Sequence, residues 1–196
     1  MDAQFLPKFP KNFEDSVLRC LPDAMAALAD PSPNRHLIPH VPRWYDAIEA
    51  EYGRSDPQML ACLHAGLWLF ADDIHRAHSI CQDIPAAFGS AWHAVMHRRE
   101  PDFFNSKYWW RRVGGIDWAD RSNPPLHEQI VAYVSAANVP ELRSWASSLG
   151  GRYSPAGFVD LVERHHRSGD PAILAALADL QRLEWATLFL MCFDRL

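Results

Sequence analysis

The sequence has no excess of basic residues, no long apolar run and no closely spaced pair of cysteines. Its 19 Lys and Arg residues face 24 Asp and Glu residues, which gives a net charge of −5, whereas a general nucleic-acid binder needs a basic excess to contact phosphates. The longest apolar stretch, Ala186–Phe193, is eight residues long and includes Thr187, whereas a transmembrane helix needs about 20. We therefore expect neither nucleic acid nor a membrane as a partner.

Two further absences concern thiols and common catalytic motifs. Cys20, Cys62, Cys81 and Cys192 form no CxxC pair, and the N-terminal residues MDAQFLPKFPKNF lack the apolar segment of a secretory signal. We therefore expect free thiols in a reducing, cytoplasmic setting. The chain also has no glycine-rich phosphate loop and no GxSxG nucleophile elbow, which leaves nucleophilic serine-hydrolase chemistry without support.

No run of β-branched residues shows the two-residue alternation of a strand, so strands should be scarce. With 48% apolar and 22% charged residues the composition is that of a globular protein. We therefore expect an all-α, single-domain helical bundle over residues 1–196. Residues 1–56 should supply N-terminal helices and a proline-rich loop, and residues 57–196 the main bundle.

Prolines divide the chain into helical segments, and three of them follow a residue that commonly caps a helix: Asp56-Pro57, Ser154-Pro155 and Asp170-Pro171. Residues 31–43 hold four prolines and should be irregular. An irregular connection is expected around 101–125, with room for a short helix at 105–112. The apolar periodicity predicts helices at 14–29, 43–53, 57–84, 86–99, 126–137, 140–149, 155–168 and 171–194.

Histidine is unusually frequent, with ten in 196 residues. His93 and His97 lie four residues apart in a predicted helix, so both rings project from one face, as in helix-borne metal sites. Glu100 is about 10.5 Å along the axis from His93, too far to share an ion with it. A third ligand would have to come from the preceding helix, where His75 or His78 is the candidate.

A metal site is nevertheless the less favoured interpretation of these histidines. Arg98 and Arg99 adjoin the pair, and fixed positive charge disfavours a dication unless Glu100 and Asp102 offset it. We therefore expect hydrogen-bonded histidines beside Trp92 and no tightly held metal. No cofactor is favoured, and a divalent metal bound by His93, His97 and His75 stays open as the alternative.

The densest polar segment, residues 92–112, carries a charge of +3, which leaves −8 for the rest of the chain. Arg98, Arg99 and Lys107 lie there among aromatic residues, an arrangement that can bind a phosphate or carboxylate group by charge-assisted hydrogen bonds. The alternative is that these cations form salt bridges that attach an irregular connection to the bundle.

Two strings in the chain are similar to sequences of a known family. Residues 91–102 (AWHAVMHRREPD) and 105–109 (NSKYW) resemble the WHxxMHRREPDxxNxKYW signature of an uncharacterised family of bacterial and fungal proteins. Residues 181–189 (QRLEWATLF) and 158–161 are similar to that family's closing helices, and AHSICQDI resembles its SHxxxQ pattern with Ala77 in place of serine. The resemblance spans roughly residues 60–195 and implies no known activity. It implies that ten polar residues form one cluster: His78, Gln82, His93, His97, Arg98, Arg99, Glu100, Asp102, Asn105 and Lys107.

The leading functional hypothesis is an enzyme or binding protein for a small anionic molecule. Arg98, Arg99 and Lys107 would hold the anion, and Gln82, Asp102 and Asn105 would complete the binding site. His78, His93 or His97 would act as general acid or base beside Glu100, because histidine titrates near neutral pH. Two alternatives remain, a metal-dependent helical-bundle enzyme and a non-catalytic interaction protein; the oligomeric state is not determined by the sequence.

Overall fold

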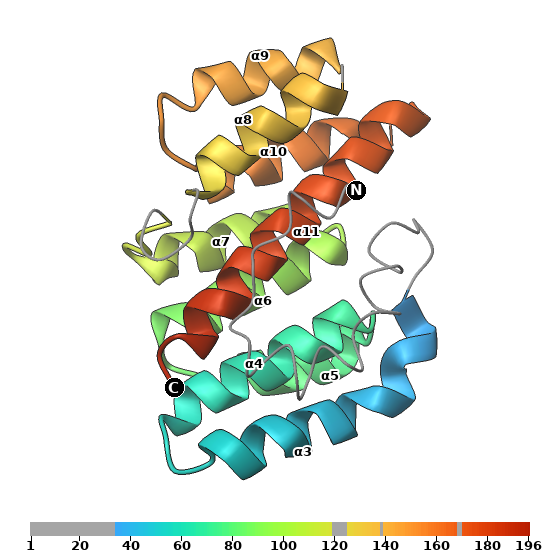
Figure 1. Cartoon of the computed structure of the whole chain (residues 1–196). Coiled ribbons are helices and arrows are strands. Elements are labelled where there is room, and N and C mark those ends of the chain that lie inside the picture. Colours follow the sequence, from blue (N-terminus) through green and yellow to red (C-terminus); the bar gives the residue numbers. More distant parts are fainter. Residues whose placement is uncertain (1–33, 119–124, 138, 168–169) are drawn as a thin grey trace.

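The computed structural model of the protein describes residues 34–118, 125–137, 139–167 and 170–196 (Figure 1). Nine α-helices and one 3-10 helix are present in these residues, with no strand, so the all-α single-domain bundle expected from the sequence is confirmed. The predicted helix at 14–29 lies outside the described residues. In chain order the elements are η3 (Asn34–His40), α3 (Val41–Tyr52), α4 (Pro57–Phe70), α5 (Ile74–Cys81), α6 (Ala87–Arg99), α7 (Phe103–Val113), α8 (Leu126–Ala137), α9 (Pro140–Ser148), α10 (Pro155–His165) and α11 (Pro171–Phe193).

The helices are stacked, with α3, α4 and α5 at one end and α8, α9 and α10 at the other (Figure 1). Helix α11, which is 23 residues long, runs diagonally across the stack and packs on both α4 and α8. Helix α6 lies inside the stack and contacts α4, α5 and α7. Its residues from Phe88 to Arg98 are all buried. Within the described residues, no helix combines the length and apolar character needed to cross a membrane.

The capping pattern in the sequence located the helix starts correctly. Asp56 accepts hydrogen bonds from the backbone N–H groups of Gln58 and Met59, and Asp170 accepts from those of Ala172 and Ile173. Ser154 accepts from the N–H of Gly157. These caps satisfy donors that have no partner inside the helix.

The single helix predicted over 57–84 is wrong, because the structure divides it into α4 and α5. Asp72 adopts a left-handed backbone conformation (φ 61°), which ends the first helix. Asp73 then caps the second by accepting from the N–H of Arg76 at 3.1 Å. The continuous apolar spacing hid this break, since both helices bury their apolar side chains in the same core.

Two proline-rich regions are also more regular than expected. Residues 34–40 form a 3-10 helix that contains Pro39, and α3 begins at Val41 with Pro42 in its first turn, where proline needs no N–H. The short helix that the sequence allowed at 105–112 is longer in the structure, where α7 extends from Phe103 to Val113. In the described part of the 101–125 connection, only residues 101–102, 114–118 and 125 are outside a helix.

The core closes around Gly66, where α4, α6 and α11 meet. A Cβ atom at this position would lie 2.9 Å from Trp92 Cζ2 and 3.1 Å from Phe189 Cδ2. The carbonyl of Gly66 also accepts a hydrogen bond from Trp185 Nε1 at 2.9 Å. Because Trp92 and Phe189 are fully buried, neither ring has space to move away.

We predict that Gly66→Ala destabilises the protein by about 1–3 kcal/mol through overpacking, which outweighs the gain of about 1 kcal/mol in helix propensity. Gly115→Ala is the matched control, because a Cβ atom there has no heavy atom within 4 Å. Urea unfolding of both variants measures the difference. Equal midpoints for Gly66→Ala and the unsubstituted protein would contradict the packing argument.

Candidate functional site

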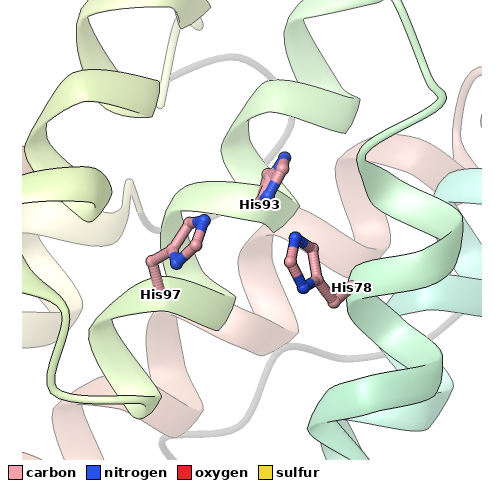
Figure 2. A group of neighbouring side chains, drawn as sticks. All are labelled: His78, His93 and His97. Carbon is pink, nitrogen blue, oxygen red and sulfur yellow. The ribbon is translucent and has the colours of Figure 1, made fainter.

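Three histidines from two helices face one another inside the bundle (Figure 2). His93 and His97 lie one turn apart on α6, and His78 approaches from α5, which packs against α6. Figure 2 shows the three rings gathered between these two helices. We refer to His78, His93 and His97 as the histidine cluster.

The rings of the histidine cluster lie close enough to share one small ligand. The ring centroids are 4.7 Å apart for His93 and His97, 4.8 Å for His78 and His93, and 5.4 Å for His78 and His97. One nitrogen atom from each ring lies within 4.8 Å of the other two. His93 and His97 are only 3% and 6% exposed, and His78 is half-buried.

Both ring nitrogens of His93 are buried without a hydrogen-bond partner among the described residues. The ring is held between His97, stacked at 4.7 Å, and Trp109, stacked at 4.0 Å. A buried polar group without a partner costs roughly 1–3 kcal/mol, so native proteins rarely leave one in that state. A water molecule or an ion bound to these two nitrogens would remove this cost.

Burial also favours the neutral form of His93 and His97. Burial first, and then the neighbouring His97 and His78, lower the pKa of His93 to about 3. Burial lowers the pKa of His97 as well, although Asp102 and Glu100 act in the opposite direction. A neutral imidazole is the form that binds a metal ion.

Glu100 and Asp102, here called the carboxylate pair, lie beside His97. The distances from His97 Nδ1 are 3.4 Å to Glu100 Oε2 and 3.8 Å to Asp102 Oδ2. Asp102 also caps α7, because its Oδ1 accepts from the N–H of Asn105 at 3.1 Å. Asn105 Nδ2 donates to Asp102 Oδ2 at 3.2 Å, which fixes the orientation of this carboxylate.

Arg98 points away from the histidine cluster into a buried ion pair. Its guanidinium donates two hydrogen bonds to the carboxylate of Glu184, one of them at 3.2 Å, and a third to Gln181 Oε1 at 3.1 Å. The hydroxyl of Tyr153 donates to the same carboxylate, and the guanidinium lies over the ring of Phe158 at 4.6 Å. Arg98 thus joins α6 to α11.

The other two cations expected to bind an anion are also paired. Arg99 donates to the carbonyl of Leu69 at the end of α4 and to Asp72 Oδ1 at 2.5 Å. Lys107 on α7 lies 3.0 Å from Asp160 Oδ1 and 2.8 Å from Glu163 Oε2 on α10. The contacts of Arg99 attach α6 to the break between α4 and α5. Those of Lys107 attach α7 to α10.

Gln82 and His75 lie outside the cluster. Gln82 is exposed at the end of α5, and its side chain makes no hydrogen bond with the described residues. His75, the third member of the alternative ligand set with His93 and His97, is exposed on α5, whereas His78 lies beside those two rings. The break at Asp72 sets the direction of α5, which is why spacing along the sequence did not distinguish His75 from His78.

Trp109, Glu184 and Asp72 are important residues that the sequence analysis did not assign to the site. Trp109 covers His93 from a different helix, and Glu184 neutralises Arg98 from 86 residues away. No spacing pattern links positions so far apart, since only the packing of α6 against α7 and α11 brings them together.

A separate cavity of about 270 Å³ lies where the end of α7 and residues 114–118 meet the start of α10. Its walls include Trp110, Trp118, Tyr153 and Arg111, and none of the three clustered histidines. The histidine cluster is therefore not part of this cavity.

Comparison of the chain with protein-family models, with curated proteins and with solved structures finds no match.

We predict that Arg98→Met lowers the free energy of unfolding by about 3–5 kcal/mol, because it leaves Glu184 as a buried charge without a cation. The double variant Arg98→Met/Glu184→Leu should recover much of this loss. Arg54→Met is the control, because Arg54 is exposed and has no side-chain hydrogen bond or ion pair among the described residues, and it should change stability by less than about 0.5 kcal/mol. Chemical denaturation of the unsubstituted protein and these three variants tests whether Arg98 has this structural role. A stable Arg98→Met variant would favour a binding role for Arg98 over a structural one.

Proposed function

We propose that the protein is a metal-dependent enzyme in which His78, His93 and His97 bind one divalent transition-metal ion. The observation that carries this proposal is the buried ring of His93, whose two nitrogens have no hydrogen-bond partner among the described residues, next to two more imidazoles. A shared ion would satisfy nitrogens of all three rings at once. It would also account for two neutral histidines, His93 and His97, in an interior where isolated polar groups are costly.

The dimensions of the histidine cluster are compatible with an ion. If three nitrogens lie within 4.8 Å of one another, an ion at their centre is at most about 2.8 Å from each, compared with about 2.0–2.1 Å in formed zinc–histidine sites. Side-chain movements of about 1 Å would close this difference, together with a rotation of the rings of His93 and His97, which are stacked at an interplanar angle of 15°. Imidazole ligands suit zinc, iron, copper and nickel, so the ligand type alone favours a first-row transition metal.

Three protein ligands leave a coordination position open for water. A bound dication would supply Lewis-acid chemistry at that position. The reaction class that this chemistry supports is hydrolysis or hydration at an electrophilic carbon or phosphorus.

In the sequence, the positive charges of Arg98 and Arg99 disfavoured a metal ion beside the histidines. In the structure, carboxylates neutralise both charges. Arg98 is paired with Glu184 and Arg99 with Asp72, so neither contributes an uncompensated positive charge beside the cluster. The same pairing weakens the anion-binding hypothesis, which needs free cations, although that hypothesis stays a prediction. The non-catalytic alternative explains these ion pairs but leaves the nitrogens of His93 without a partner.

Elemental analysis of protein purified without a histidine tag tests the proposal. We expect about one equivalent of zinc, iron or another first-row metal, which falls below about a tenth in His93→Ala and His97→Ala. His75→Ala is the matched control, because His75 is an exposed histidine on the same helix as His78. It should keep the metal, whereas His78→Ala should lose it.

Circular dichroism of each variant separates metal loss from unfolding. If His93→Ala unfolds, His97→Ala and His78→Ala still test the site. A folded, metal-free protein that binds no Zn²⁺, Fe²⁺, Cu²⁺ or Ni²⁺ when each is added overturns the proposal, and so does a metal content unchanged by all three substitutions. Either result would leave water between the rings.

A further inference from the structure

The two ring nitrogens of His97 have different surroundings. Nδ1 is buried without a hydrogen-bond partner of normal geometry among the described residues, and it lies 3.4 Å from Glu100 Oε2 and 3.8 Å from Asp102 Oδ2. The in-plane bonding directions of Nδ1 and Nε2 diverge, so a small rotation that turns an Nδ1–H towards the carboxylate pair leaves the lone pair of Nε2 for another ligand.

We infer that Glu100 and Asp102 act as positioning residues that hold His97 in its Nδ1–H tautomer and so direct Nε2 to the metal ion. The metal part of this inference rests on the proposed function, whereas the tautomer part concerns the metal-free protein as well. In metal sites, a ligating histidine commonly donates its second N–H to a carboxylate, which orients the ring and makes it a stronger ligand.

The local sequence explains why this carboxylate pair is available. Helix α6 ends at Arg99, so the chain turns immediately after His97 and brings Glu100 and Asp102 back beside its ring. Asp102 then begins α7, and Asn105 holds it through both its backbone and its side-chain nitrogen. The residues His97, Glu100, Asp102 and Asn105 thus form one connected unit.

Charge supports a positioning role that also stabilises the ion. Three neutral imidazoles do not compensate a buried dication, and two carboxylates within about 4 Å of His97 offset part of its charge. The neighbouring Arg98 and Arg99 do not compete for this pair, because Glu184 and Asp72 already hold them.

The variants Glu100→Gln and Asp102→Asn test this role with little structural change. Both are nearly isosteric, and asparagine is itself a good helix cap, so Asp102→Asn should keep α7 intact. Asp160→Asn is the matched control, because Asp160 pairs with Lys107 and lies in another contact. We expect the double variant Glu100→Gln/Asp102→Asn to bind Zn²⁺ about 10–100-fold more weakly in competition with a chromophoric chelator, and Asp160→Asn to be unchanged.

The tautomer is measured independently by long-range ¹⁵N–¹H NMR correlation of the imidazole rings in metal-free protein. We expect the Nδ1–H form of His97 in the unsubstituted protein and in Asp160→Asn. In the double variant the population should shift towards Nε2–H, because an amide side chain can donate to Nδ1.

The outcomes separate this inference from the proposed function. Protein that binds no metal but shows the Nδ1–H form overturns the metal centre and leaves the carboxylate role standing. Protein that binds metal equally tightly in the double variant, with an unchanged tautomer, overturns the inference and leaves the centre standing. A Co²⁺ spectrum whose ligand set changes in Glu100→Gln alone would make Glu100 a ligand and overturn its positioning role.

Discussion

Helix α6 has almost no face turned towards solvent, and the rest of the structure depends on this constraint. Its residues from Phe88 to Arg98 are buried without interruption, although they include two histidines and an arginine. Buried polar groups require partners, so each of these side chains restricts the elements packed around the helix. Arg98 requires Glu184 on α11. The two histidines require His78 and a small polar ligand, a water molecule or an ion, at the ring nitrogens.

The same constraint connects stability with the candidate site. The two arginines that follow His97 are each paired with a different element: Arg98 with α11, and Arg99 with the end of α4 and Asp72. The pairing of Arg99 stabilises the break after α4, and that break sets the direction of α5, which carries His78. The partly buried Arg99–Asp72 ion pair thus supports the arrangement of the histidine cluster.

Much of the fold could be predicted from local signals. Asp-Pro and Ser-Pro pairs mark the starts of α4, α10 and α11, because a capping side chain and a proline at the first helical position act within one turn of chain. The break at Asp72 could not be predicted from apolar periodicity, which continues through it. Besides the local cap at Asp73, Asp72 is paired with Arg99, a residue 27 positions further along the chain that only tertiary packing brings to it.

The sequence by itself determined the helical class and, through the spacing of His93 and His97, that two imidazoles share one face of a helix. It also determined that carboxylates and cations gather around them, since these residues are close neighbours along the chain. Only the tertiary structure decided which groups face each other: His78 and not His75 joins the cluster, and Arg98, Arg99 and Lys107 are taken up by ion pairs. The reason is physical, because helical periodicity fixes directions within one helix, whereas the angle and register between two helices depend on contacts between residues far apart in the chain.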